Sequence, residues 1–259
     1  PFDIATGGLP FGRLVEIFGL EDSGKTALVK RAGLRAFLKN IYQRVVTSDE
    51  RGVKKVSYER LDPNTYDVVV AYIDNEQSFD DDNSLVVEGK NVDFILGRID
   101  TINQVFKACE QTVHEMKEIE KETGRPQFVV FILDSLASTS SEQEMDQEWG
   151  TEDYSRMPKQ LRQGFRKLVR YINRFNVLFI VTNQVSDSFV KQKQKNPNAM
   201  PDDSAFSSSG GRACKYYASQ WIFVQRTPYK FKMVKGGEED GFVTEILTAK
   251  NRLKKPRRK

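Results

Sequence analysis

The chain has 259 residues, of which 39% are hydrophobic and 29% are charged, and its formal net charge is +4. This balance predicts a soluble, globular protein with one large α/β core or two small ones, and excludes a membrane-spanning chain because no apolar run is long enough. Its two cysteines, Cys109 and Cys214, lie far apart, which argues against a disulfide framework and favours a reducing, cytosolic compartment.

Apolar strand-like segments alternate along the chain with segments of helical periodicity. The predicted elements are a strand at Arg13–Phe18, a helix at Lys25–Asn40, a strand at Val68–Ile73, a helix at Ile102–Glu122, a strand at Phe128–Leu133, a helix at Pro158–Phe175, a strand at Val177–Val181 and later, partly antiparallel strands at Trp221–Arg226, Tyr229–Val234 and Phe242–Ala249. Fully apolar strands that alternate with helices are typical of a parallel sheet covered on both faces. We therefore predict one α/β domain over residues 1–259, with a twisted, mostly parallel central sheet and antiparallel strands toward the C-terminus.

The first predicted strand runs directly into GLEDSGKT, residues 19–26, which has the GxxxxGK[ST] spacing of a P-loop. Its glycines would let successive backbone N–H groups point at a phosphate chain, Lys25 would supply a cation for the β- and γ-phosphates, and the Thr26 hydroxyl would bind Mg²⁺. The helix that follows would place its N-terminus at the phosphates. The residues expected to contact the nucleotide are Gly19, Glu21, Asp22, Ser23, Gly24, Lys25, Thr26 and Ala27.

Polar residues follow three other predicted strands. Asp134 ends the strand FVVFIL and matches a Walker B carboxylate that would help to position Mg²⁺. Glu76 follows the strand at Val68–Ile73, where it is either a base for the attacking water or an ordinary loop residue. Gln184 ends the third strand, where it is either a sensor of the γ-phosphate or a plain strand cap.

Two polar segments follow buried strands, at Ser138–Met157 and Ser186–Gly211. Ligands of open α/β sheets bind at the carboxyl ends of the strands, so these segments are candidate functional loops. Basic residues cluster on the predicted helix at Pro158–Phe175, on residues 191–195 and in the last ten residues. Each cluster singly is equally compatible with a solvated surface.

These pieces together resemble the core of the RecA-type recombinases, the group of bacterial RecA and phage UvsX. The matching stretches are Gly7–Thr26, Tyr72–Asp80, Phe128–Ser138, Phe165–Leu168, Leu178–Gln184, Ser209–Ser219 and Ala249–Pro256. They occur in the family's order along nearly the whole chain. The GGLPFGR lead-in, the IDNE segment and the GG…KYYAS segment are more specific to this family than the P-loop is.

The resemblance implies a role for each matching position. Glu76 is the general base for water, Gln184 the γ-phosphate sensor and Asp134 the Walker B acid. Lys250 and Arg252 correspond to basic residues that reach the ATP of the neighbouring protomer, in the manner of an arginine finger. Two further positions, Lys215 and Tyr216, correspond to the protomer interface.

The resemblance also implies two DNA-binding loops, at about residues 143–159 and 186–209, the second ending at paired glycines. The residues expected to contact DNA are Tyr154, Lys159, Arg162, Arg166, Phe189, Lys191, Lys193, Lys195, Phe206, Ser209, Gly210, Gly211 and Arg212. Such contacts bind the backbone without sequence preference. For each aromatic residue taken singly, packing within its loop is the simpler interpretation.

The sequence departs from the family pattern in two places. Asp80 matches an aspartate that contacts adenine, but Asn83 stands where the family commonly has an adenine-stacking tyrosine. The link Gln43–Asp67 is longer than usual, and the sequence assigns it no function. The chain starts at Pro1 without a methionine, so we expect it to be trimmed from a longer protein.

The resemblance implies a DNA-dependent ATPase and recombinase that uses ATP and Mg²⁺. Its expected partners are single-stranded DNA, homologous duplex DNA, further copies of itself in a helical filament, and single-strand-binding and mediator proteins. The expected location is the cytoplasm of a bacterial or phage-infected cell. The alternatives are a hexameric helicase on the same core, a non-catalytic paralogue that scaffolds a true recombinase and, with least support, a small-molecule kinase.

Overall fold

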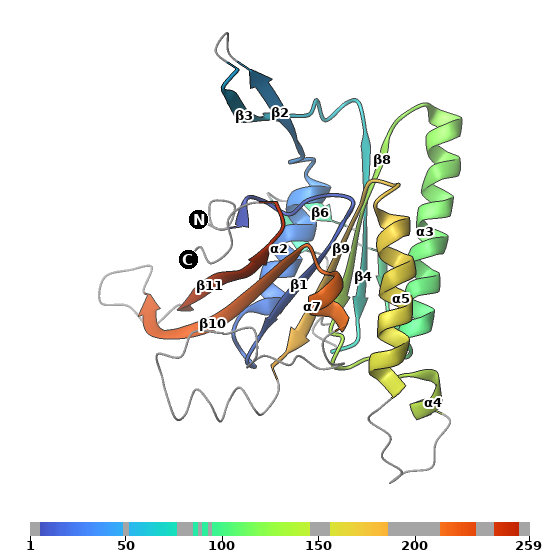
Figure 1. Cartoon of the computed structure of the whole chain (residues 1–259), viewed down its shortest axis with the longest axis vertical. Coiled ribbons are helices and arrows are strands. Elements are labelled where there is room, and N and C mark those ends of the chain that lie inside the picture. The colour runs from blue at the N-terminus through green and yellow to red at the C-terminus, as the bar shows by residue number, and fades with distance from the viewer. Residues whose placement is uncertain are drawn as a thin grey trace.

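The computed structural model describes residues 6–48, 52–76, 85–87, 90–92, 95–145, 156–185, 213–231 and 241–253. The elements in these residues are β1 (Arg13–Gly19), α2 (Lys25–Phe37), β2 (Tyr42–Ser48), β3 (Lys54–Arg60), β4 (Asp67–Asp74), β5 (Leu85–Val87), β6 (Lys90–Val92), β7 (Ile95–Gly97), α3 (Ile102–Thr123), β8 (Gln127–Asp134), α4 (Glu142–Met145), α5 (Arg156–Ile172), β9 (Val177–Gln184), α7 (Ala213–Tyr217), β10 (Gln220–Phe231) and β11 (Gly241–Asn251). Figure 1 shows their arrangement around one central sheet.

The central sheet has seven strands in the order β11-β10-β1-β9-β8-β4-β7. Neighbouring strands from β10 to β7 run parallel, and β11 pairs antiparallel with β10 at the edge. Parallel neighbours need crossover connections, which the helices between the strands supply. The predicted fold class is therefore confirmed, including the antiparallel pairing near the C-terminus.

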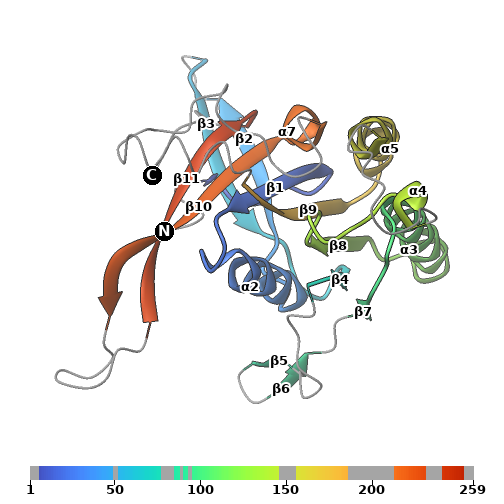
Figure 2. The ribbon, with the colours of Figure 1, turned by 90° about the horizontal axis from the view of Figure 1, so that it is seen from below.

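Helices cover both faces of this sheet, as Figure 2 shows, with α2 on one face and α3, α5 and α7 on the other. Side chains alternate between the two cores because successive residues of a strand point to opposite faces. Leu14 of β1 packs in the core beneath α3 and α5, whereas Val15 packs in the core beneath α2. None of the helices in the described residues is both long enough and apolar enough to cross a membrane.

The strand β10 differs from the prediction of two separate strands at Trp221–Arg226 and Tyr229–Val234. It runs without a break from Gln220 to Phe231, and the pairing with β11 shifts register between Arg226 and Lys230. Pro228 lies in this irregular stretch, where a bulge tolerates the missing backbone N–H. The pairing with β11 continues on both sides of the proline, so the two predicted segments form one strand.

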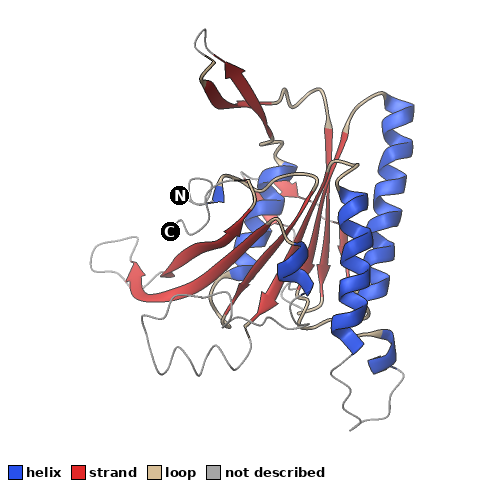
Figure 3. Cartoon of the chain, in the orientation of Figure 1, coloured by secondary structure: helices blue, strands red, loops and turns tan. Residues whose placement is uncertain are grey.

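The link Gln43–Asp67 contains the antiparallel hairpin of β2 and β3, which the sequence analysis did not predict. The hairpin projects from the end of the molecule opposite α4 (Figures 1 and 3). It follows the C-terminal end of α2 and returns to the start of β4. The hairpin therefore lies at the end of the sheet where the parallel strands begin, and the P-loop lies at the other end, where they finish.

Candidate functional site

The P-loop connects the end of β1 to the start of α2, and two of its glycines are required by the backbone. A Cβ atom at Gly19 would lie 2.1 Å from the carbonyl oxygen of Val224 on β10, closer than any side chain tolerates. Gly24 has a φ of 91°, in the left-handed region that disfavours residues with a Cβ, and forms the N-cap of α2. The sequence motif thus corresponds to a strand, a tight loop and a helix in the required order.

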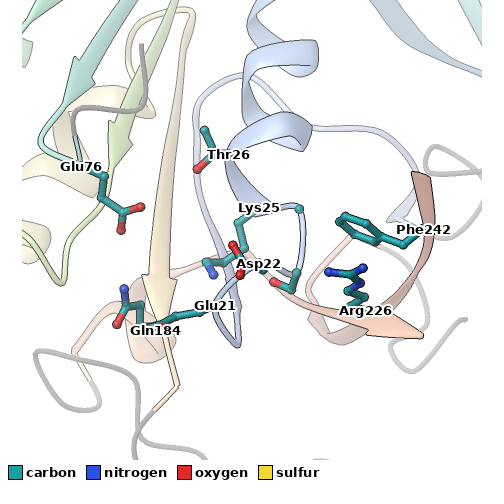
Figure 4. Close-up of a pocket in the computed structure, with 10 residues that line it drawn as sticks. Glu21, Asp22, Lys25, Thr26, Glu76, Gln184, Arg226 and Phe242 are labelled. Carbon is teal, nitrogen blue, oxygen red and sulfur yellow. The ribbon is translucent and has the colours of Figure 1, made fainter. Parts of the chain in front are cut away.

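A pocket of about 520 Å³ opens around this loop (Figure 4). Its lining residues are Glu21, Asp22, Ser23, Gly24, Lys25, Thr26, Glu76, Gln184, Arg226 and Phe242. In Figure 4, Glu76 and Gln184 lie on one side of the P-loop, and Arg226 and Phe242 lie on the other. The structure therefore brings the predicted base and sensor to the predicted phosphate loop.

Lys25 lies at the floor of the pocket and is 8% exposed. Its ammonium group donates a 2.7 Å hydrogen bond to the carbonyl oxygen of Leu20. Burial lowers the pKa of Lys25, and the nearby carboxylates, with Glu76 and Asp134 foremost, oppose that shift. Lys25 is thus a largely buried cation whose ammonium group is held by the carbonyl of Leu20 and whose charge is favoured by nearby carboxylates.

Asp134 ends β8 beneath the pocket and is 1% exposed. Its two carboxylate oxygens accept hydrogen bonds from the hydroxyls of Tyr72 and Thr182. Its backbone carbonyl accepts bonds of 2.7 Å from the N–H of Asn75 and 3.3 Å from the N–H of Glu76. Asp134 therefore fixes the turn that presents Glu76, although its own side chain is not among those that line the pocket.

Asn75 holds the same turn from its other side. Its carboxamide donates 2.8 Å and 2.9 Å hydrogen bonds to the carbonyl of Ile99 and the hydroxyl of Thr139, and accepts a 3.2 Å bond from the N–H of Ile99. The exposed carboxylate of Glu76 thus stands on a turn whose backbone is anchored at several points.

Four predicted residues lie together in a second cluster, outside the pocket lining. The ammonium of Lys250 donates hydrogen bonds of 2.7 Å to the carbonyl of Lys215 and 3.1 Å to that of Tyr216, and the guanidinium of Arg252 donates a 3.1 Å bond to the latter. Burial, aided by the positive charge of Arg252, lowers the pKa of Lys250 to about 8. The residues predicted for the protomer interface and for the neighbour's ATP therefore share one surface.

The family was then identified by comparison with known proteins. The family model for the RecA N-terminal domain matches residues 64–259, three quarters of the chain. The chain belongs to the RecA family. Protein RecA of Xylella fastidiosa (strain M23) is 28% identical over 257 residues, which cover 98% of this chain and 59% of that protein. Protein RecA of Xanthomonas axonopodis pv. citri (strain 306) is 29% identical over 254 residues, which cover 98% of this chain and 60% of that protein. The chain thus spans about three fifths of the length of these curated relatives.

Two residues that line the pocket, Arg226 and Phe242, were not predicted from the sequence. The guanidinium carbon of Arg226 lies 4.1 Å from the centroid of the Phe242 ring. A Cβ atom at Gly24 would be 4.0 Å from the same ring, so these side chains border the P-loop. They reach the pocket because β10 lies next to β1 in the sheet, an adjacency that no local sequence signal reveals.

The predicted DNA-contacting residues Lys159, Arg162 and Arg166 lie on the exposed face of α5. The opposite face is anchored in the core by apolar residues that include Leu161, Phe165 and Leu168. The helix therefore presents a stripe of cations at helical spacing. Ala27 is exposed in the first turn of α2, and neither it nor Gly19 lines the pocket.

Part of the predicted site lies outside the described residues. These positions are Asp80, Tyr154, Phe189, Lys191, Lys193, Lys195, Phe206, Ser209, Gly210, Gly211 and Arg212. Their assignments stay predictions.

Proposed function

We propose that this chain is the ATPase core of a DNA-dependent recombinase, which assembles on single-stranded DNA and promotes pairing and strand exchange with homologous duplex DNA. The observation that carries the proposal is the pocket that unites a complete P-loop with Glu76 and Gln184. Membership of the RecA family supports it further. If the P-loop motif had arisen by chance, there would be no reason for a carboxylate and an amide at the ends of two other strands to line the same pocket.

ATP would bind with its triphosphate along the P-loop. Lys25 neutralises the β- and γ-phosphates, and the N-terminus of α2 adds backbone N–H donors. Glu76 orients a water against the γ-phosphorus and takes its proton as the oxygen–phosphorus bond to ADP breaks, leaving ADP and phosphate. Gln184 is at the end of β9, directly before the predicted second DNA-binding loop. A contact between Gln184 and the γ-phosphate would therefore affect the position of that loop.

The residues fit a magnesium ion bound together with the nucleotide. The Thr26 hydroxyl lines the pocket, and Asp134 lies beneath it. No cluster of three or more carboxylate, histidine or cysteine side chains in the described residues could hold a metal by itself. Mg²⁺ keeps several waters and is bound by few protein groups and the phosphates. When bound, the ion would neutralise charge on the transferring phosphoryl group.

The nucleobase would lie on the other side of the P-loop from Glu76, against Phe242 and Arg226. An aromatic face with a guanidinium across it offers a stacking surface for a purine. This surface would supply the stacking contact that Asn83 cannot, because an asparagine side chain has no ring.

The second cluster would complete the site of an adjacent protomer. Lys250 and Arg252 would place positive charge against the triphosphate bound by the neighbour, and Tyr216, which is 69% exposed, would lie in the same contact. A head-to-tail contact that does not close produces a filament. Binding of ATP would then stabilise the assembly that binds DNA.

The test is ATP hydrolysis by the purified protein with and without single-stranded DNA. Strong stimulation by the DNA is expected, because the predicted loops leave the sheet at the same edge as the nucleotide site. Hydrolysis that is indifferent to DNA would contradict the proposal and favour the scaffold paralogue. Electron microscopy with ATP and DNA separates the expected filament from the closed ring of a helicase.

A further inference from the structure

The hairpin of β2 and β3 has one face that the proposed function does not use. Directly opposed residues of an antiparallel pair share a face, and so do alternate residues of one strand. The register therefore places on one face, called here the ribbon face, the residues Tyr42, Arg44, Val46, Ser48, Lys54, Val56, Tyr58 and Arg60. All of them are exposed. The half-buried residues of the two strands, Val45 and Ser57, belong to the other face.

The ribbon face carries three cations and no carboxylate. Arg44 is directly opposite Tyr58, and Tyr42 is directly opposite Arg60, so cationic and aromatic side chains interleave across the two strands. Tyr42 is 55% exposed and Tyr58 is 47% exposed. The one acidic residue of β2 and β3, Glu59, lies on the other face opposite Gln43. The connecting residues 49–51 lie outside the described part of the chain.

The hairpin is attached firmly at its base, so the ribbon face is presented in a defined position. The guanidinium of Arg60 donates a 3.3 Å hydrogen bond to the carbonyl of Lys39, which also accepts a 2.8 Å bond from the hydroxyl of Tyr66. The N–H of Leu61 donates a 2.9 Å bond to the carbonyl of Ile41. An exposed two-stranded hairpin is only marginally stable by itself, so these bonds to the residues that follow α2 help to stabilise it.

We propose that the ribbon face is a second nucleic-acid site, which binds the phosphate backbone of DNA at the end of the molecule opposite the nucleotide pocket. A two-stranded β-ribbon is narrow enough to enter the major groove of a duplex, and exposed aromatic rings between cations also form the platforms that single strands stack on. The occupant is a polyanion because three cations without a carboxylate attract phosphates. A second copy docked by the same face would bring like charges together.

This site is separate from the predicted DNA-binding loops. Those loops follow α4 and β9 at the carboxyl edge of the sheet, whereas the hairpin projects from the opposite edge (Figure 1). The length of α2, 13 residues, or about 20 Å, separates the P-loop from the base of the hairpin. A DNA segment on the ribbon face would therefore be held apart from the strand at the loops. Such an arrangement suits the capture of a second DNA segment, a role that rests on the proposed function.

The test compares the double variant Arg44→Gln/Lys54→Gln with Lys55→Gln, which removes a cation from the other face of the same hairpin. Arg60 is left in place because it anchors the hairpin. The probes are a fluorescent duplex oligonucleotide and a fluorescent single strand, with anisotropy measured without nucleotide over a range of salt concentrations. The double variant should bind DNA about tenfold more weakly than the parent protein near 0.1 M salt. For the duplex, the slope of log affinity against log salt concentration should be smaller in magnitude by about two.

A loss confined to the duplex, or one confined to the single strand, supports the proposal and identifies which DNA the ribbon face holds. Unchanged affinity of the double variant for both probes, or an equal loss in Lys55→Gln, overturns it, and an acidic protein surface becomes the better partner. ATP hydrolysis without DNA should be unchanged in the double variant, which reports its folding. The binding assay contains no nucleotide, so it measures DNA binding to the ribbon face even if the proposed ATPase mechanism is wrong.

Discussion

The carboxamide of Asn183 donates a 2.9 Å hydrogen bond to the carboxyl group of Glu16, and both side chains are fully buried. Glu16 lies on β1, three residues before the P-loop, and Asn183 immediately precedes Gln184 on β9. The N–H of Gln184 in turn donates a 2.9 Å bond to the carboxamide oxygen of Asn183. A movement of Gln184 would therefore be transmitted to the strand that carries the phosphate loop, because a buried polar pair is costly to separate.

The same carboxyl group acts on the second cluster. Burial and then Glu16 raise the pKa of the Cys214 thiol, and Glu16 partly opposes the lowering of the Lys250 pKa that burial and Arg252 cause. One buried acid on β1 thus lies between β9, the strand that carries Gln184, and the lysine predicted to reach the ATP of a neighbour.

The first prediction concerns the pH dependence of DNA-stimulated ATP hydrolysis. The pKa of Lys250 is lowered from 10.5 to about 8, so the lysine loses its charge as the pH rises through about 8. If its cation stabilises ATP in the neighbouring protomer, hydrolysis should fall over that range. Lys250→Arg should retain activity at the alkaline end, because an arginine stays protonated. A pH profile that is the same for both proteins would contradict this role.

The second prediction concerns Glu16→Gln. Loss of the carboxyl charge removes an interaction that raises the pKa of Lys250, so the alkaline decline in hydrolysis should move to lower pH. The control is Glu245→Gln, which removes a carboxylate from β11, the strand that carries Lys250. The profile of this control should match that of the parent protein. An unmoved midpoint in Glu16→Gln would show that Glu16 does not act on the lysine.

Much of the fold could be predicted from the sequence, because β4, β8 and β9 contain continuous apolar runs typical of a strand buried on both faces, and the core of β1 is apolar apart from Glu16. Each predicted segment lies within the observed strand. The β2–β3 hairpin was missed because its exposed faces mix polar and apolar residues and give no core-facing pattern.

The phosphate side of the site was equally visible, since its residues belong to motifs that directly follow strands. The side of the pocket formed by Arg226 and Phe242, proposed here to bind the nucleobase, was not visible, because these residues meet the P-loop only through the order β11-β10-β1 in the sheet. The cluster around Lys250 likewise depends on backbone carbonyls of α7, which carry no sequence signature.

Glu76→Gln tests the assignment of the general base. The amide cannot take a proton from water, so turnover should fall by about 10²–10⁴-fold while ATP binding is retained. Steady-state hydrolysis and binding of a fluorescent ATP analogue measure the two effects separately. The matched control is Glu122→Gln, which neutralises an exposed carboxylate on α3 outside the pocket lining and should hydrolyse ATP at close to the parent rate. Full turnover by Glu76→Gln would exclude this residue as the base.

Phe242→Ala tests the proposed base-stacking surface. Removal of the ring should raise KM for ATP by about two- to thirtyfold, the range of a stacking or cation–π contact, with kcat little changed. Phe242→Tyr keeps the ring and should behave like the parent protein. Equal loss of kcat and of kcat/KM in the alanine variant would instead indicate that Phe242 holds the P-loop in place and does not stack on the nucleobase.

Gly19→Ala tests whether close packing of β1 against β10 sets the shape of the P-loop. The added methyl group would meet the carbonyl of Val224, so the strands must separate, and the unfolding free energy should fall by about 1–3 kcal/mol with loss of ATP binding. Denaturant unfolding and nucleotide titration measure the two effects. Leu20→Ala is the matched control, because the neighbouring side chain is 39% exposed and the bond to Lys25 uses its backbone carbonyl. Wild-type stability in Gly19→Ala would mean that the loop has room the structure does not indicate, whereas lost ATP binding at unchanged stability would place the defect in the loop alone.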